Sequence, residues 1–134
     1  MTIRAAACAC GQLSATCEGE PMRVSICHCL ECKRRSGSAF SWNSRWQRNQ
    51  VQIAGQSQSY TRTGDEGGRA TFHFCPGCGV TVHYSTDDSS ETLVISVGAF
   101  TDPQFQAPEV SVYHAADRRV PWLEIAADPL RIID

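Results

Sequence analysis

The feature that most constrains this chain is the placement of its cysteines, which fall into three tight groups. Of the eight cysteines in 134 residues, two lie in "CAC" at 8–10, three in "CHCLEC" at 27–32 and two in "CPGC" at 75–78, while Cys17 stands alone. The N-terminal residues contain no apolar run that would serve as a secretion signal, so we expect a cytoplasmic protein with reduced thiols. In that compartment, clustered cysteines indicate metal or redox chemistry rather than a disulfide framework.

Length and charge narrow the possible classes of protein. A chain of 134 residues accommodates one domain, which we expect to span residues 1–134. The formal net charge is −2, so no strong attraction to nucleic acid or to a membrane surface is expected. No segment is long and apolar enough to span a bilayer. We therefore predict no nucleic-acid and no membrane partner, and the sequence leaves the oligomeric state open.

Most of the chain has the alternation of apolar and polar residues that is typical of β-strands. This pattern predicts a mostly β fold of coiled antiparallel sheets. Only "LECKRRS" at residues 30–36 could form a helix longer than one turn, and Gly37 would cap its C-terminus. The predicted strands lie at residues 11–19, 22–27, 40–46, 51–55, 57–63, 70–75, 80–85, 92–100, 109–113 and 121–125.

The "CPGC" and "CAC" motifs together can supply four sulfur ligands. Pro76 and Gly77 favour the tight turn of a zinc knuckle, and Gly79 can adopt the positive φ that directs backbone amides toward sulfur. Residues two apart in an extended segment project to the same side, so the cysteines of "CAC" can act as a pair. The sequence therefore predicts a closed four-thiolate zinc site, formed by Cys8, Cys10, Cys75 and Cys78.

The "CHCLEC" motif supplies three sulfurs, from Cys27, Cys29 and Cys32. In an extended segment, His28 faces the other way from Cys27 and Cys29, which makes it a poor ligand for the same metal. It could instead donate a hydrogen bond near the site or carry a proton, although a structural role is equally consistent with its position. Three protein ligands with an open fourth position are typical of catalytic zinc, whereas four are typical of structural zinc.

Two other divisions of the cysteines are also possible from sequence alone. In one, Cys17 completes the "CHCLEC" group as a closed site. In the other, "CLEC" and "CPGC" form an ordinary zinc ribbon and leave "CAC" spare. The division into four and three uses each group as a unit, and we prefer it for that reason.

Several other residues have both a functional and a structural interpretation. Cys27, Cys29 and Cys32, called the trio below, are followed directly by Lys33, Arg34 and Arg35. These basic residues could offset the negative charge of the trio or contact substrate carboxylates, but a solvated helix face has the same pattern. Cys17 is expected in the core. His73 and His83 are expected to be structural. Four aromatic residues are expected mainly in the core, with one or two of them lining a substrate cleft: Phe40, Trp42, Trp46 and Trp122.

Four segments of the chain resemble the glutathione-dependent formaldehyde-activating enzymes, a family that includes centromere protein V-like proteins. They are "CACGQLSATCEGEP", "CHCLECKRRSGSAFS", "FHFCPGCGVTVHY" and "APEVSVYHAADRRVPWLEI". The resemblance runs from near residue 5 to near residue 125, and its CxC…CxCxxC…CxxC order is highly specific.

The resemblance implies an Mss4-like fold with two zinc ions. It implies a structural zinc on Cys8, Cys10, Cys75 and Cys78 and a catalytic zinc on Cys27, Cys29 and Cys32. The implied activity is that of a carbon–sulfur lyase, which adds glutathione to formaldehyde to form S-hydroxymethylglutathione. The alternative from a different class is a non-catalytic binding module in which both zinc ions are architectural.

Overall fold

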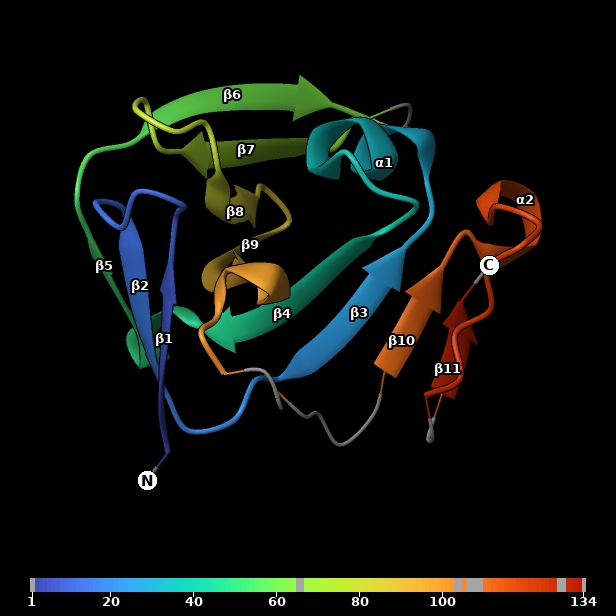
Figure 1. The fold of residues 1–134 in the computed structure, drawn as a ribbon, viewed down its shortest axis with the longest axis horizontal. Coiled ribbons are helices and arrows are strands. Elements are labelled where there is room, and N and C mark those ends of the chain that lie inside the picture. The colour runs from blue at the N-terminus through green and yellow to red at the C-terminus, as the bar shows by residue number, and fades with distance from the viewer. Residues whose placement is uncertain (1, 65–66, 103–104, 106–109, 128–129, 134) are drawn as a thin grey trace.

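The computed structural model describes residues 2–64, 67–102, 105, 110–127 and 130–133. Strands dominate it, and they form two sheets (Figure 1). The small sheet has the order β1-β2-β5 and the large sheet the order β11-β10-β3-β4-β9-β8-β7-β6. The small sheet contains β1 (Ile3–Ala7), β2 (Ser14–Glu18) and β5 (Val51–Ala54).

Most strands that lie side by side in the large sheet are antiparallel. Its strands are β3 (Arg23–Cys27), β4 (Ser41–Gln47), β6 (Gln58–Thr63), β7 (Arg69–Phe74), β8 (Thr81–Thr86), β9 (Ser89–Ser96), β10 (Val110–Tyr113) and β11 (Leu130–Ile133). Short helices connect some of them, namely α1 (Leu30–Ser36), η1 (Arg48–Gln50), η2 (Val97–Ala99) and α2 (Ala115–Arg118). The predicted mostly β fold is confirmed, while a single domain over residues 1–134 and the Mss4-like fold name stay predictions.

One strand departs from the antiparallel pattern. β10 pairs in parallel with both β3 and β11, whereas the other pairings among the described residues are antiparallel. A parallel neighbour requires a crossover connection, and the segments before and after β10 are long enough to provide one. The second crossover contains α2.

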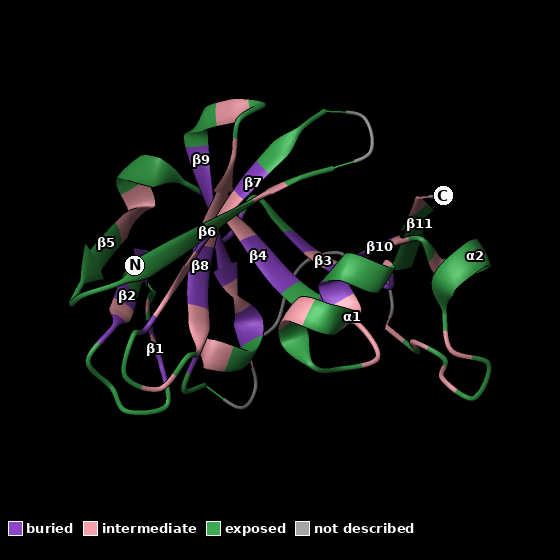
Figure 2. Ribbon diagram, turned by 90° about the horizontal axis from the view of Figure 1, so that it is seen from above, coloured by how far each residue is buried: buried purple, intermediate pink, exposed green. Residues whose placement is uncertain are grey.

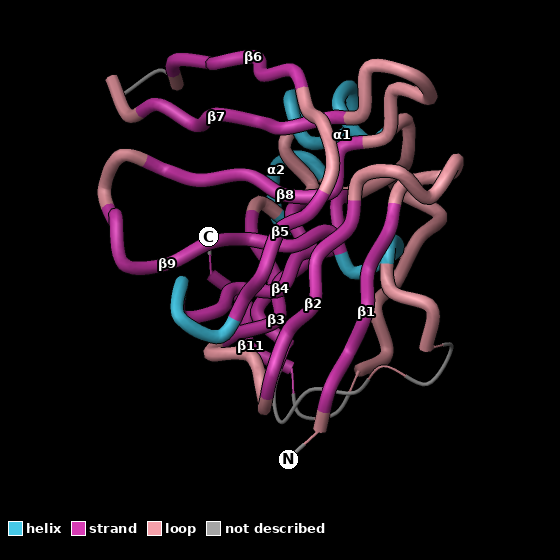
Figure 3. The backbone as a smooth tube through the Cα atoms, turned by 90° about the vertical axis from the view of Figure 1, so that its left-hand side faces the viewer, coloured by secondary structure: helices cyan, strands magenta, loops and turns pink. Residues whose placement is uncertain are grey.

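The hydrophobic core lies between the two sheets. In Figure 3 the small sheet lies in front of the large sheet, and in Figure 2 the buried residues are concentrated on inner strands such as β4 and β8. Trp46 of β4 is fully buried there, and its indole Nε1 donates to Ser44 Oγ at 2.8 Å. Ser44 Oγ in turn donates to the carbonyl of Ile95 at 2.9 Å, so both buried polar groups have partners. Cys17 is also fully buried, as predicted.

Some predictions about the strands and the core are wrong. The segment 121–125 forms a turn followed by irregular chain rather than a strand, and Trp122 within it is 79% exposed. Trp42 is 40% exposed, because the adjacent residues of β4 face inward instead. It lines a cleft, which is the alternative expected for one or two of these aromatic residues. β1 was not among the predicted strands: its alanines have low strand propensity, and its pairing with β2 forms it.

Helix α1 has the predicted bounds and the predicted cap. The Sγ of Cys29 accepts a hydrogen bond from the backbone N–H of Cys32 at 3.3 Å, which caps the N-terminus of the helix. Gly37 adopts φ 64° and donates its N–H to the carbonyl of Lys33 at 2.8 Å. In the described part of the chain, no helix has the length and apolar character needed to cross a membrane.

Gly55 lies where the chain passes from β5 in the small sheet to β6 in the large sheet. Its φ is +101°, and a Cβ at this position would lie 1.9 Å from the carbonyl oxygen of Gln12. The backbone here therefore excludes any side chain, both by conformation and by space.

We predict that Gly55→Ala lowers the free energy of unfolding by about 3 kcal/mol or more, because the strained φ and the clash with Gln12 add. Gly67→Ala is the matched control, since Gly67 has φ +87° but nothing within 4 Å of its Cβ position. The control should cost only about 1–2 kcal/mol. Denaturant unfolding of both variants measures the difference, and equal losses would contradict the role of the close approach.

A pair of stacked histidines joins β7 and β8. The rings of His73 and His83 lie 4.6 Å apart at an interplanar angle of 8°, and His83 is buried. Burial, together with the positive charges of His73 and Arg48, lowers the pKa of His83 from 6.5 to about 4. The structural role predicted for these two histidines is consistent with this packing.

We predict that acid destabilises the protein partly through His83. Below pH 6.5 the unfolded chain binds a proton at this residue that the folded chain does not bind until about pH 4. From pH 7.5 to pH 5, the wild type should therefore lose roughly 2 kcal/mol more unfolding free energy than His83→Phe. Denaturant unfolding of both proteins at the two pH values tests this, and equal losses would exclude the effect.

Candidate metal centres

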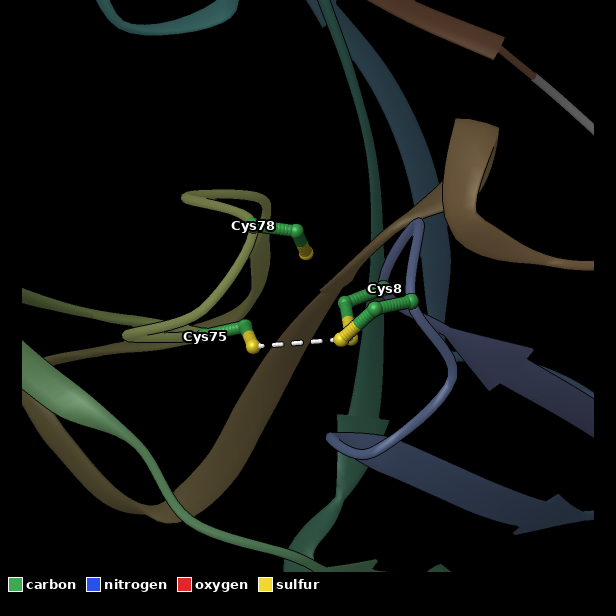
Figure 4. Close-up of side chains that lie close together, drawn as sticks. Cys8, Cys75 and Cys78 are labelled. Atoms are coloured by element: carbon green, nitrogen blue, oxygen red, sulfur yellow. Dashed lines mark hydrogen bonds between the residues drawn. The ribbon is translucent and has the colours of Figure 1, made fainter.

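The first cluster combines cysteines from two distant segments. Cys8 and Cys10 follow β1, while Cys75 and Cys78 lie in the turn between β7 and β8. Their four sulfurs all lie within 4.8 Å of one another, and Figure 4 shows side chains of both segments turned toward a common point. The Cys8–Cys10 and Cys10–Cys75 sulfur distances are both 3.6 Å. A tetrahedron with zinc–sulfur bonds of 2.3 Å has edges of about 3.8 Å. The spacing of these four cysteines, called the quartet below, therefore fits zinc.

Backbone amides point at the sulfurs of the quartet. Leu13 N–H donates to Cys8 Sγ and Gly77 N–H donates to Cys75 Sγ, each at 3.3 Å. Gly79 adopts φ +80° and donates its N–H to the carbonyl of Cys75 at 2.8 Å, which closes the knuckle turn. The two N–H bonds to sulfur favour the thiolate form that metal binding requires.

Gln12 contacts the quartet, and the sequence did not predict this contact. Its Nε2 donates to Cys75 Sγ at 3.0 Å and to the carbonyl of Gln56 at 2.7 Å, and its Oε1 accepts from the Gln56 N–H. Hydrogen bonding by Gln12 is the largest cause that lowers the pKa of Cys75, to about 6. Its closeness in sequence to Cys10 was the only signal that could have indicated this role.

The second cluster is local in sequence. Cys27 ends β3, Cys29 caps α1 and Cys32 lies in the first turn of α1. Their sulfurs lie within 4.8 Å of one another, with Cys32 buried and the other two half-buried. Among the described residues, no fourth histidine, cysteine or carboxylate belongs to this trio, and Cys17 belongs to neither cluster.

The trio favours a thiolate at Cys32. The hydrogen bond from the Cys27 thiol is the largest cause that lowers the pKa of Cys32 to about 5, and the Ser41 hydroxyl and the Arg35 charge act in the same direction. The pKa of the Cys27 thiol is raised, because it shares this hydrogen bond with Cys32 and because it is buried. Three thiols with one readily ionised member form a donor set that suits a soft divalent metal.

His28 lies next to the trio in sequence but packs elsewhere. Its ring is buried and makes an edge contact with Phe40 at 5.9 Å, and its backbone N–H donates to the carbonyl of Tyr113 at 3.0 Å. It also lines a cavity of about 250 Å³ near β10 and α2. This placement agrees with the expectation that His28 faces away from the sulfurs.

The three basic residues after the trio point to different partners. Lys33 Nζ donates to the carbonyl of Arg118 in α2, and Arg34 pairs with Glu31 at 3.4 Å on the surface. Arg35 lies over the rings of Phe72 and Tyr84, with its Cζ 4.6 and 5.1 Å from their centroids. The charge of Arg35 is among the main causes that lower the pKa of Cys32.

A cleft of about 740 Å³ is lined by residues from the surroundings of both clusters. Ala9 and Gly79, which adjoin cysteines of the quartet, line one part of it, and Arg35 and Ser41, which act on Cys32, line another. Asn43 also lines the cleft, and its Nδ2 donates to Ser41 Oγ at 3.0 Å. The volume is that of a small-molecule site.

Taken together, the two sheets and the two sulfur clusters define a mostly β protein with two groups of cysteines that could hold metal ions. The chain belongs to the glutathione-dependent formaldehyde-activating enzyme family, whose sequence pattern it matches over residues 3–116. Its fold is similar to a crystal structure of a Rhodobacter sphaeroides protein, with a TM-score of 0.56 and 18% identity. That similarity covers 78% of this chain and 91% of the other. No curated protein matches the sequence.

We predict that Gln12→Ala raises the pKa of Cys75 from about 6 toward the ordinary thiol range. In metal-free protein at pH 7, alkylation of Cys75 should then slow by roughly severalfold, because less of it is thiolate. Peptide-resolved mass spectrometry after brief iodoacetamide treatment measures the rate. Cys32 is the internal reference, since Gln12 does not act on it, and an unchanged Cys75/Cys32 ratio would contradict the role of Gln12.

Proposed function

We propose that this protein is a zinc-dependent carbon–sulfur lyase that adds a thiol such as glutathione to formaldehyde or a related aldehyde. The observation that carries the proposal is the presence of a four-sulfur cluster and a separate three-sulfur cluster. Arg35 and Ser41, which lower the pKa of Cys32 in the three-sulfur cluster, also line a cleft. Membership of the glutathione-dependent formaldehyde-activating enzyme family supports the same chemistry.

In this proposal the quartet holds a structural zinc and the trio holds a catalytic zinc. Four thiolates fill a tetrahedral site, whereas three leave a position for a substrate. A non-catalytic binding module would need a fourth protein ligand at the trio, and the described residues contribute none. When bound at the trio, zinc would lower the pKa of a substrate thiol and polarise an aldehyde oxygen.

The residues around the trio prepare it for an anionic substrate sulfur. Three thiolates carry excess negative charge, which would repel a fourth, and the guanidinium of Arg35 offsets that charge. The Ser41 hydroxyl, oriented by Asn43, donates to Cys32 and withdraws further charge from it. We also propose a substrate-binding role for Lys33, Arg34 and Arg35, of which Arg35 is best placed.

The proposed reaction is an addition without net oxidation or reduction. The sulfur of the thiol forms a bond to the carbonyl carbon, the carbon–oxygen π bond breaks, and the proton of the thiol ends on the oxygen. The cleft would hold both reactants near each other and near Cys32, which supplies proximity. His28 is buried against Phe40, and we propose that it supports the turn between β3 and α1 rather than transferring this proton.

We also propose a cytoplasmic location, because clustered cysteines stay reduced there and remain available to hold metal.

We predict that Cys29→Ser removes one of two bound zinc ions and the thiol–aldehyde activity, while the fold persists. Loss of one thiolate from a three-ligand site leaves too few donors, and the quartet is untouched. Metal analysis by mass spectrometry measures the stoichiometry, and exchange NMR with formaldehyde and glutathione measures turnover against the uncatalysed rate. The control is Cys17→Ala, a buried cysteine outside both clusters, which should keep both metals.

The experiment also separates the catalytic from the architectural interpretation. Activity at the uncatalysed rate in a wild type that carries two zinc ions would overturn the lyase proposal. Retention of both metals by Cys29→Ser would overturn the assignment of the trio.

A further inference from the structure

The side chain of Gln12 joins the quartet to the segment that links the two sheets. This linking segment, residues 55–57, lies between the end of β5 in the small sheet and the start of β6 in the large sheet (Figure 1). Gln12 Nε2 donates to Cys75 Sγ at 3.0 Å and to the Gln56 carbonyl at 2.7 Å, while its Oε1 accepts from the Gln56 N–H at 2.9 Å. One amide therefore holds both backbone polar groups of Gln56 and contacts a sulfur of the quartet.

The linking segment depends on Gln12 for its position. Its three residues are exposed, so hydrophobic burial does not fix them. A Cβ on Gly55 would lie 1.9 Å from the Gln12 carbonyl oxygen, so the two backbones are in close contact. Ser57 Oγ lies 3.5 Å from His73 Nδ1, which is long for a hydrogen bond. Within the described part of the chain, the shortest side-chain hydrogen bonds to this segment thus come from Gln12.

The orientation of the Gln12 amide depends in turn on the position of the Cys75 sulfur. A hydrogen bond restricts both distance and angle, and the two hydrogens on Nε2 serve one partner each. With zinc bound at the quartet, a bond of about 2.3 Å would hold Cys75 Sγ and tie it to Cys8, Cys10 and Cys78. Without a metal, weaker hydrogen bonds alone hold this sulfur. Metal binding would therefore fix the acceptor on which the orientation of Gln12 depends.

The same amide acts on the metal site. The charge of four thiolates exceeds that of one zinc ion, and N–H donors to the sulfurs offset the excess. Gln12 Nε2 is a side-chain donor to Cys75, while the backbone amides of Leu13 and Gly77 donate to Cys8 and Cys75. Groups that hydrogen-bond to metal ligands orient them, and their loss typically lowers metal affinity. Coupling between two sites is reciprocal, so a docked segment that zinc stabilises also stabilises bound zinc.

We propose that Gln12 is a positioning residue that couples the metal content of the quartet to the docking of residues 55–57. Loss of metal from the quartet releases this exposed segment, and release of Gln12 speeds loss of the metal. The quartet thereby controls a segment on the surface of the protein, at the point where the chain passes from one sheet to the other. The inference concerns the quartet and its neighbours, so it is independent of the proposed chemistry at the trio.

Gln50 provides a matched control, because its amide also holds backbone groups. Its Nε2 donates to the carbonyls of Glu18 and Glu20 at 2.8 and 3.0 Å, and its Oε1 accepts from the Gln47 N–H at 2.8 Å. These three partners are backbone groups outside both cysteine clusters. The Gln47 amide is therefore a reference for the Gln56 amide.

The test is amide hydrogen exchange, followed by NMR on the full-length protein loaded with zinc and then stripped with EDTA. Exchange at the Gln56 amide should become about tenfold faster when zinc is removed, because its hydrogen bond to Gln12 opens, while exchange at Gln47 should stay the same. Gln12→Ala should show fast exchange at Gln56 with or without zinc. Gln50→Ala, and also Cys29→Ser at the trio, should keep the zinc response at Gln56.

The rate of zinc release gives a second readout, measured in proteins that also carry Cys29→Ser so that the quartet is followed alone. A chromogenic chelator should take zinc from Gln12→Ala about tenfold faster than from Gln50→Ala or from the protein with neither change. Gln12 is exposed, so its replacement should leave the fold intact, and Gln12→Asn, too short to reach both partners, is the second variant. Unchanged exchange at Gln56 after zinc removal, equal acceleration at Gln56 and Gln47, or equal zinc release from Gln12→Ala and Gln50→Ala would each overturn the inference.

Discussion

The convergence of the "CAC" and "CPGC" segments is the constraint on which the rest of the structure depends. The first segment belongs to the small sheet and the second to the large sheet, so the quartet of sulfurs joins the two. Gln12 and Gly55 support the same junction, one by hydrogen bonds to Cys75 and Gln56 and the other by allowing close approach of the backbone. The buried residues of the small sheet belong to the same core as those of the large sheet, and a metal at the quartet would therefore couple metal binding to the packing of that core.

The trio differs from the quartet in what it joins. Its sulfurs lie within six residues of one another, at the end of β3 and the start of α1, so it bridges no distant parts of the chain. A metal lost from the trio would leave the core between the sheets intact. A metal site that folding does not require can keep an open position and exchange ligands. The quartet, in contrast, supplies all four donors and lies at the junction of the two sheets.

Sequence patterns predicted the local features well. Of the distant contacts, they predicted the grouping of the "CAC" and "CPGC" cysteines but not the side chains that support it. The cysteine groups, the bounds of α1 and its Gly37 cap follow from short-range spacing, as do most of the strands. Trp122 and the segment around it were wrongly placed in a strand, because aromatic residues favour strands but a turn forms there. Gln12 could not be assigned from sequence, since it acts on a residue brought near only by the fold. The parallel pairing of β10 likewise depends on a crossover that no local pattern encodes.

The short helix α1 shows how adjacent residues of one type acquire different roles. Lys33, Arg34 and Arg35 differ little as a sequence, but successive residues of a helix point about 100° apart. Lys33 therefore reaches α2, Arg34 faces solvent beside Glu31, and Arg35 turns inward onto aromatic rings near Cys32. Because stacking restricts the guanidinium and few polar groups compete for it, its charge acts at short range on the trio. A lysine at this position would keep the charge but lose the fixed plane, so the identity of Arg35 matters as much as its sign.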